Sequence, residues 1–325
     1  MTCLRSDRDL DLISDDRIFS APAPLGIFFE TGSAAPGPAE ILQALIDHAP
    51  IHAEIEKNLG HVIRSAVANP GAAIRYRLVH LTAIAHGLSA RQALPLACAV
   101  EYFHLASLLF DDLPVMDDAM ERRGRICLHL LHGESAVILG ALALITRAYS
   151  LIGKVIADAP RDARLGIHAQ VEHCLGSTGI LNGQARDLRF TPGSLSAIAI
   201  AMGKTVPLVT MAMTIPARLG GATEGRLRLL RRLSIYWGLY YQGLDDLKDL
   251  LERTEMSGKT SGRDAALGRP NIAHQLGVPR TRGYLCRLAC LAENCISEIS
   301  SNHPQSRFLF TFQMGLLQRL ESLSR

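Results

Sequence analysis

The chain has 325 residues, of which 48% are hydrophobic, and its formal net charge is +3. This apolar content is ample for a large buried core. A net charge so close to neutral argues against a nucleic-acid partner or a general attraction to membranes, although a local basic segment can still hold a phosphate. Length alone does not choose between one large domain and two small ones.

The cysteines and the first residues indicate a cellular compartment. The seven cysteines are scattered and include no C-x-x-C pair, so they indicate neither a disulfide framework nor a zinc site. Asp7, Asp9, Asp15 and Asp16 stand where a signal peptide carries basic and then apolar residues. The longest uninterrupted apolar runs, such as 136–145, are about half of what a bilayer needs. We therefore expect a cytoplasmic protein without a membrane span.

The periodicity of the chain predicts helices. Residues 1–38 mix acidic residues with Pro- and Gly-rich stretches, and we expect a poorly ordered arm there. From residue 39 onward, nearly every segment has helical length and period, and few alternate as strands do. The predicted helices are 39–48, 51–68, 73–87, 90–113, 134–157, 161–190, 193–218, 223–252, 262–274, 279–300 and 304–323. No break resembles a flexible linker, so we predict an all-α, single-domain bundle over residues 39–325.

One of these helices ends in four carboxylates within eight residues: Asp111, Asp112, Asp117 and Asp118. Carboxylates repel one another unless a cation lies between them, and a hard divalent metal such as Mg2+ is the natural candidate. A solvated acidic turn is the alternative interpretation. Pro114 cannot continue a helix without losing a hydrogen bond, so we expect a bend that brings Asp117 back toward Asp111.

A second acidic segment favours the metal. Asp245, Asp246 and Asp249 end another largely apolar run, and Asp245 and Asp249 share a helix face at i, i+4. Two such helices facing each other predict a cavity with a metal-binding mouth and an apolar interior, which suits a lipid diphosphate. His104 lies on the helix face of Asp111, and we expect it to face the ligand.

Basic residues complete this predicted mouth. Arg122 and Arg123 follow the first acidic segment, and their planar forks suit phosphate oxygens. Other basic candidates for the mouth are Arg75, Lys204, Lys259 and Arg269, although each of them taken singly is more often a solvated surface charge.

In this order, the residues resemble the motifs of a known family, the trans-isoprenyl diphosphate synthases, and within it the bacterial geranylgeranyl diphosphate synthases. The two aspartate motifs lie about 130 residues apart, and the resemblance covers roughly residues 60–275. It is carried by His104 to Pro114, Arg122-Arg123-Gly124, Gly133-Glu134, Gly183-Gln184 with Asp187, Lys204-Thr205, Tyr241-Gln242 with Asp245-Asp246, and Gly258-Lys259 with Asp264.

The resemblance implies an isoprenoid-synthase fold around a deep apolar cavity, a homodimer, and ionisation of an allylic prenyl diphosphate on Mg2+. The metal ligands it implies are Asp111, Asp112 and Asp117 on one side and Asp245, with Asp246 and Asp249 less directly, on the other. The substrate-binding residues it implies are Arg75, His104, Arg122, Arg123, Gln184, Lys259 and Arg269. Lys204 would help to neutralise the leaving pyrophosphate, and Thr205 and Gln242 would line the carbocation with dipoles. Isopentenyl diphosphate then attacks the cation.

The residues just before the first motif set the product length in the resembled family. Ala106 and Ser107 are the fifth and fourth residues before Asp111, and both are small. A bulky aromatic residue there would close the pocket early. The resemblance therefore implies a deep pocket and a twenty-carbon product or substrate.

The chain also departs from the family pattern. Where the family has Gly-Lys-Arg-Leu-Arg-Pro around the isopentenyl diphosphate, residues 71–76 place Ala72 at the phosphate-binding lysine. Arg75, His104 and Arg123 remain, so the acceptor site is weakened but not erased. Ile126-Cys127 replaces the usual Pro-Thr, and Arg269 stands where a late lysine is usual.

Three hypotheses follow from these departures. The first is a chain-elongating prenyltransferase that makes geranylgeranyl diphosphate. The second, motivated by Ala72, is a terpene synthase or a prenyltransferase to a non-phosphate acceptor on the same scaffold. The third is a non-catalytic regulatory subunit of a prenyl synthase, which would have no need of two complete metal motifs.

Overall fold

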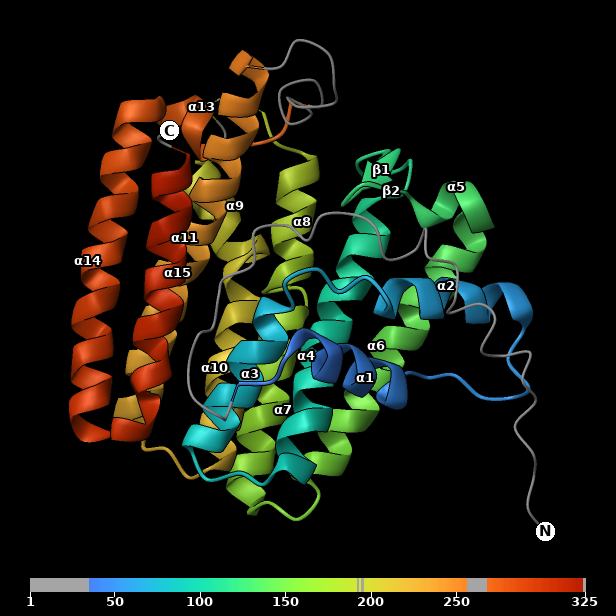
Figure 1. The fold of residues 1–325 in the computed structure, drawn as a ribbon, viewed down its shortest axis with the longest axis horizontal. Coiled ribbons are helices and arrows are strands. Elements are labelled where there is room, and N and C mark those ends of the chain that lie inside the picture. Colours follow the sequence, from blue (N-terminus) through green and yellow to red (C-terminus); the bar gives the residue numbers. More distant parts are fainter. Residues whose placement is uncertain (1–34, 192, 194–195, 256–267, 324–325) are drawn as a thin grey trace.

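A computed structural model of the protein describes residues 35–191, 193, 196–255 and 268–323, and it is almost entirely helical (Figure 1). Its helices are α1 (Pro38–His48), α2 (Lys57–Val67), α3 (Ile74–Ala85), α4 (Ala90–Asp111), α5 (Leu128–His132), α6 (Glu134–Ile156), α7 (Arg161–Leu175), α8 (Ile180–Leu188), α9 (Ala197–Lys204), α10 (Val206–Leu219), α11 (Glu224–Glu255), α13 (Ile272–Leu276), α14 (Val278–Asn302), the 3-10 turn η3 (Pro304–Arg307) and α15 (Phe308–Ser322). The predicted all-α class is confirmed. Most of the predicted arm, residues 1–34, lies outside the described residues.

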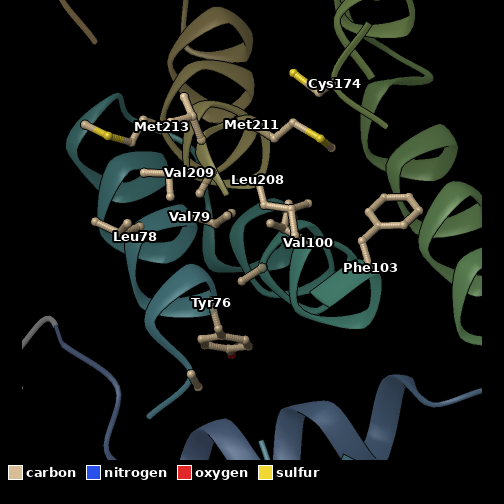
Figure 2. Packing of buried hydrophobic residues seen from close by; sticks show 14 of the residues in the cluster. Tyr76, Leu78, Val79, Val100, Phe103, Cys174, Leu208, Val209, Met211 and Met213 are labelled. Carbon is tan, nitrogen blue, oxygen red and sulfur yellow. The ribbon is translucent and has the colours of Figure 1, made fainter. Parts of the chain in front are cut away.

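Helix α4 lies at the centre of the bundle and packs against α3, α6 and α10. Its sequence is apolar on most sides, as a helix enclosed by neighbours requires. Figure 2 shows Val100 and Phe103 of α4 close to Leu208 of α10, with Val79 of α3 beside them. One cluster of buried side chains extends from α1 to α15. Each fully buried Leu, Val or Phe side chain in it stabilises the fold by about 1.5–3 kcal/mol.

Two predicted helices are each broken in two. The prediction 161–190 is wrong between α7 and α8, where Gly176 and Gly179 form a turn whose backbone leaves no room for a side chain at residue 179. The prediction 193–218 is wrong at Thr205, because Pro207 lacks the N–H that a continuous helix would use. Both breaks matter for the site, since they set the ends of α8 and α9.

Three other predictions differ from the structure. Helix α2 begins at Lys57 instead of residue 51, because the Glu56 carboxylate caps the N–H groups of Asn58 and Leu59. The predicted helix 262–274 lies partly outside the described residues, and its visible part begins only at Ile272. No strand was predicted, but β1 (Glu121–Arg122) and β2 (Arg125–Ile126) form a two-stranded hairpin.

The apolar helices also bear on membrane insertion. Three stretches of the described chain, Ala90–Asp111, Glu134–Ile156 and Ala197–Leu219, are long and apolar enough to cross a membrane by length and composition. The length of uninterrupted apolar runs is therefore insufficient ground for excluding a span. Burial inside the bundle accounts for most of the first and third stretches, whereas less than half of Glu134–Ile156 is buried.

Helices α8 and α9 approach closely at two glycines. A Cβ atom at Gly183 would lie 2.3 Å from the backbone carbon of Gly203, too close for any real structure. We expect Gly183→Ala to destabilise the fold by at least about 2 kcal/mol, since backbone atoms cannot yield as a flexible side chain can. Gly153→Ala in α6, where nothing lies within 4 Å of the added atom, is the matched control, and helix propensity favours it by about 0.5–1 kcal/mol. Urea denaturation of the two variants measures the difference, and equal stabilities would contradict this close packing.

Candidate functional site

The first acidic segment folds back on itself. Helix α4 ends at Asp111, and the N–H of Asp117 donates to the carbonyl oxygen of Asp111 over 3.0 Å. The N–H of Ala119 likewise donates to the carbonyl oxygen of Asp112, over 3.1 Å. The predicted bend after Pro114 is therefore confirmed, and it brings the backbone of Asp117 beside that of Asp111.

Both acidic segments contribute to one cavity of about 480 Å3 that opens to solvent. It lies between α8, α9, α11 and the segment before α13. The polar residues that line it include Asp117, Asp187, Lys204, Thr205, Asp246 and Arg269. Since Asp117 belongs to the first acidic segment and Asp246 to the second, the two segments meet at one cavity, and metal binding there stays a prediction.

The ammonium group of Lys204 interacts with three carboxylates. Its Nζ atom donates to Asp187 over 3.0 Å, and Asp111 and Asp117 are close enough to interact with it electrostatically. Burial lowers the pKa of Lys204, but the carboxylates of Asp111, Asp187 and Asp117 outweigh this effect, so its pKa is raised. Burial raises the pKa of Asp111, and Lys204 opposes that rise. The cavity is thus built to hold positive charge.

Two arginines and one glutamine also bind carboxylates of the first acidic segment. The Arg122 Nε atom donates to Asp112 over 2.6 Å, and the guanidinium Nη2 atom of Arg269 donates to Asp117 over 2.9 Å. Gln184 Nε2 donates to Asp111 over 2.9 Å. The structure therefore brings Arg122, Gln184 and Arg269 to the first acidic segment, as expected. Lys259 lies outside the described residues.

The carboxylates suit a hard cation in chemistry, although they are not gathered around one point. Within the part of the chain that the structure describes, no three His, Cys, Asp or Glu side chains form a ready metal cluster. Asp111, Asp112 and Asp117 instead point to protein cations or an amide. Their oxygen donors are those that Mg2+ prefers, and the negative dipole ends of α4 and α8 at Asp111 and Asp187 add to the attraction for positive charge. The residues fit Mg2+, provided that it replaces the cations that now hold them.

The second acidic segment contains a buried hydrogen-bonded chain. The Thr205 hydroxyl donates to Gln242 over 2.7 Å, and Gln242 Nε2 donates to Asp246 over 2.8 Å. The other oxygen of Asp246 accepts from the N–H of Ile272 over 2.6 Å. Asp246 is 2% exposed, so both of its oxygens support the wall of the cavity rather than face the solvent.

Asp245 and Asp249 lie one helical turn apart on α11, and Asp245 is exposed. The pKa of Tyr241 is raised, first by the charge of Asp245 and then by burial. Asp245 therefore lies near Tyr241 at the solvent side of the mouth, where it differs from the buried Asp246.

A second group of cations lies below the first acidic segment. Burial, together with the charges of Arg75, Arg123 and Arg122, lowers the pKa of His104 well below its usual value, so this histidine is neutral near pH 7. Arg123 occupies the turn between β1 and β2 with a φ of 54°, and its guanidinium donates to the Asn69 carbonyl oxygen over 2.7 Å. Arg75, His104 and Arg123, which were predicted together, are thus close together.

The two small residues before the first motif lie inside the bundle. Ala106 is fully buried, and the Ser107 hydroxyl donates to the His104 carbonyl oxygen over 2.8 Å. The depth of the pocket beside them stays a prediction.

Two residues of the site received no role from the sequence. Asp187 was part of a motif, but its partner is Lys204, 17 residues away in the chain. Tyr241 lines a second, smaller and largely apolar cavity of about 350 Å3, together with Arg75, Trp237 and Phe312. The position of Asp187, three residues after Gln184 on one helix, was the available signal.

Comparisons with known proteins agree with this arrangement. Residues 56–309 match the polyprenyl synthetase family. A geranylgeranyl diphosphate synthase of Pantoea ananas is 34% identical over 277 residues, which are 83% of this chain and 89% of that protein. A chloroplastic geranylfarnesyl diphosphate synthase of Leucosceptrum canum is 35% identical over 196 residues, which are 58% of this chain and only 54% of that protein.

The fold has close counterparts among solved structures. A geranyltransferase from Helicobacter pylori, solved with magnesium and isoprenyl diphosphate, has a TM-score of 0.72 at 23% identity, over 88% of this chain and 94% of that one. A farnesyl and geranylfarnesyl diphosphate synthase from Zymomonas mobilis also has a TM-score of 0.72, at 22% identity, over 85% of this chain and 94% of that one. The family match and the relative from Pantoea ananas, together with two acidic segments on one cavity, show that the chain belongs to the polyprenyl synthetase family and is a trans-prenyltransferase.

Proposed function

We propose that this enzyme condenses an allylic prenyl diphosphate with isopentenyl diphosphate, with Mg2+ as cofactor, and that its product is geranylgeranyl diphosphate. The observation that carries the proposal is the shared cavity, in which Asp117 and Asp246 from the two acidic segments lie with Lys204. The names of the relatives, several of them geranylgeranyl diphosphate synthases, support the product.

Asp111, Asp112 and Asp117 would hold Mg2+ on one side of the cavity, and Asp245 and Asp249 on the other. The bound metal supplies positive charge that stabilises pyrophosphate as it leaves. Asp246 would support the wall, because both of its oxygens are already occupied.

The protein's own cations then act on the diphosphate. Lys204, Arg122 and Arg269 each lie on a carboxylate of the site, so they are positioned at the mouth before any substrate arrives. We propose that Lys204, Arg122 and Arg269 would release these carboxylates and bind the diphosphate oxygens when Mg2+ is bound. Since they already lie at the mouth, their charges would stabilise the leaving pyrophosphate and lower the barrier to breaking the allylic C–O bond. The Thr205 hydroxyl donates to Gln242. The lone pairs of the Thr205 oxygen would then be available to stabilise the carbocation.

The acceptor diphosphate would bind to Arg75 and Arg123, with His104 beside them as a neutral hydrogen-bonding group. These residues would hold the acceptor beside α4, about two helical turns before its end at Asp111. The double bond of the acceptor would attack the allylic cation, and the pyrophosphate would take up the proton that is released.

The test is the product formed with and without the acceptor. The pure protein, incubated with farnesyl diphosphate, isopentenyl diphosphate and Mg2+, is expected to make an acid-labile diphosphate of twenty carbons. The absence of elongation at millimolar acceptor would overturn the proposal. A hydrocarbon or alcohol formed from geranylgeranyl diphosphate alone would identify a terpene synthase instead, and activation of a second synthase without turnover would identify a regulatory subunit.

We also propose that the enzyme is a homodimer that pairs through α5 and α6. The outward face of these helices exposes large apolar side chains, namely Leu130, Leu131, Ile138, Leu139, Leu142 and Tyr149. A group of large exposed apolar side chains of this kind is typical of an interaction surface. A second copy of the chain would cover this face.

Sedimentation of single variants tests the dimer. Leu139→Arg on α6 is expected to yield monomers at micromolar concentration, because a buried unpaired guanidinium costs several kcal/mol. Leu291→Arg on α14 is the matched control, since Leu291 is also exposed and α14 lies on the opposite side of the bundle from α5 (Figure 1), and this variant should stay dimeric. A native protein that sediments as a monomer, or one that floats with phosphatidylcholine vesicles, would contradict the proposal.

We further propose that the enzyme works in a reducing, cytoplasmic environment. The six cysteines in the described ranges form no disulfide bond with one another. Some of the relatives are chloroplastic by name. Cell fractionation with an antibody to the protein would distinguish the two locations.

A further inference from the structure

A carboxylate is buried in the middle of the apolar helix α4, where no metal motif lies. Glu101 is 1% exposed, and it stands one helical turn from His104 and more than two turns from Asp111. Burying a charged group in this way is costly unless partners compensate. The partners of Glu101 therefore show what it is for.

The first partner is the start of helix α3. One oxygen of Glu101 accepts the backbone N–H of Tyr76 over 3.0 Å. Tyr76 is the third residue of α3, so its N–H is one of those that no residue of its own helix can satisfy. Ala73, the residue before α3, has a φ of 45° and makes no side-chain cap. A residue from another helix thus fixes where α3 begins.

The other partners are two guanidinium groups. Burial raises the pKa of the Glu101 carboxyl, whereas the charges of Arg75 and Arg123 and the N–H of Tyr76 favour its charged form. Arg75 is the second residue of α3, directly before Tyr76, and Arg123 comes from the β1–β2 turn. The carboxylate is therefore close enough to two cations from separate elements to interact with both electrostatically.

Both arginines lie close to the loop before α3, and the buried Nε atom of Arg75 has no hydrogen-bond partner within the described residues. A Cβ atom at Gly71 would lie 2.6 Å from the guanidinium carbon of Arg123, so this guanidinium packs directly on the loop. A buried cationic donor without a partner, as at Arg75, costs free energy, and binding of an anion would remove this cost.

We propose that Glu101 is a positioning residue for the acceptor diphosphate: it fixes the start of α3 and holds Arg75 and Arg123 side by side at one anion site. Without the carboxylate, two like charges repel each other and separate. The consequence is larger in this chain than in one with a lysine at residue 72, because Ala72 adds no third charge. This inference rests on the proposed use of isopentenyl diphosphate.

The test is Glu101→Gln, which keeps an oxygen for the Tyr76 N–H but removes the charge between the arginines. We expect the KM for isopentenyl diphosphate to rise about tenfold, the effect of weakening one charge-assisted contact. The kcat and the KM for the allylic substrate should change less than twofold, and Glu101→Asp should recover part of the loss. Asp47→Asn on α1, an exposed carboxylate-to-amide change, is the control and should change nothing.

Two results would overturn the inference. A merely structural Glu101 would lower the melting temperature and affect both substrates alike, and a simple counter-charge would make Glu101→Gln bind the acceptor more tightly. A double-mutant cycle with Arg75→Lys adds a second readout, because a residue that acts through Arg75 gives effects that do not add.

Calorimetric titration with isopentenyl diphosphate alone separates this inference from the proposed function. A native protein that elongates, with an unchanged variant, refutes only the role of Glu101. A native protein that does not bind the acceptor at all refutes both.

Discussion

Asp111→Asn is expected to lower kcat by at least about 100-fold, the scale on which loss of one preorganised electrostatic contact acts in an active site. Asp111 ends α4, lies among Lys204, Asp117 and Asp187, and accepts from Gln184. The amide keeps the shape of the side chain but removes the charge that a metal needs. The Mg2+ concentration for half-maximal rate should rise together with the loss of kcat.

The matched control lies in the same turn. Asp118 is exposed and has a φ of 50°, a conformation that asparagine tolerates well, so Asp118→Asn should fold normally. Its kcat should stay within twofold of the native value. If both variants lost activity equally, the acidic turn as a whole would matter through its net charge, and Asp111 would have no individual role as a metal ligand.

The sequence predicted those features that a local rule decides. The loss of a hydrogen bond at Pro114 predicted the bend that returns Asp117 to Asp111, and the turn is there. Helical periodicity placed α4 and α11 and therefore both acidic segments. Periodicity failed at Pro207: it predicted one helix through this proline because the run is apolar, whereas the helix breaks at Thr205.

The remaining features depend on contacts between distant segments. Lys204 lies among carboxylates that come from α4, the following turn and α8, and no spacing along the chain shows this convergence. The β1–β2 hairpin has only two residues in each strand, too few for a period-two pattern, although Arg123-Gly124 with φ values of 54° and 73° is a two-residue turn. Glu101 was visible as a lone charge in an apolar run, but its partners Tyr76 and Arg123 come from outside its helix.

Ala72→Lys is the second change with a large expected effect, and it addresses the acceptor site directly. Ala72 lies in the loop before α3, next to Gly71, which packs on the guanidinium of Arg123. A lysine there would add a third positive charge beside Arg75 and Arg123. One charge-assisted contact contributes roughly 1.5–3 kcal/mol, so we expect the KM for isopentenyl diphosphate to fall about 10- to 100-fold. The kcat should change little, because the new contact is made in the ground state and the transition state alike.

Ala72→Met separates the added charge from the added bulk, since methionine has a similar length and no charge. It should leave the KM for isopentenyl diphosphate within twofold of the native value. An equal gain from methionine would mean that the side chain only packs the loop. No gain from lysine, in an enzyme that turns over geranylgeranyl diphosphate without acceptor, would mean that the site no longer serves a diphosphate acceptor. Since Asp111 and Asp245 are proposed to act on the allylic substrate in either case, the two variants test whether residue 72 determines which molecule meets the cation.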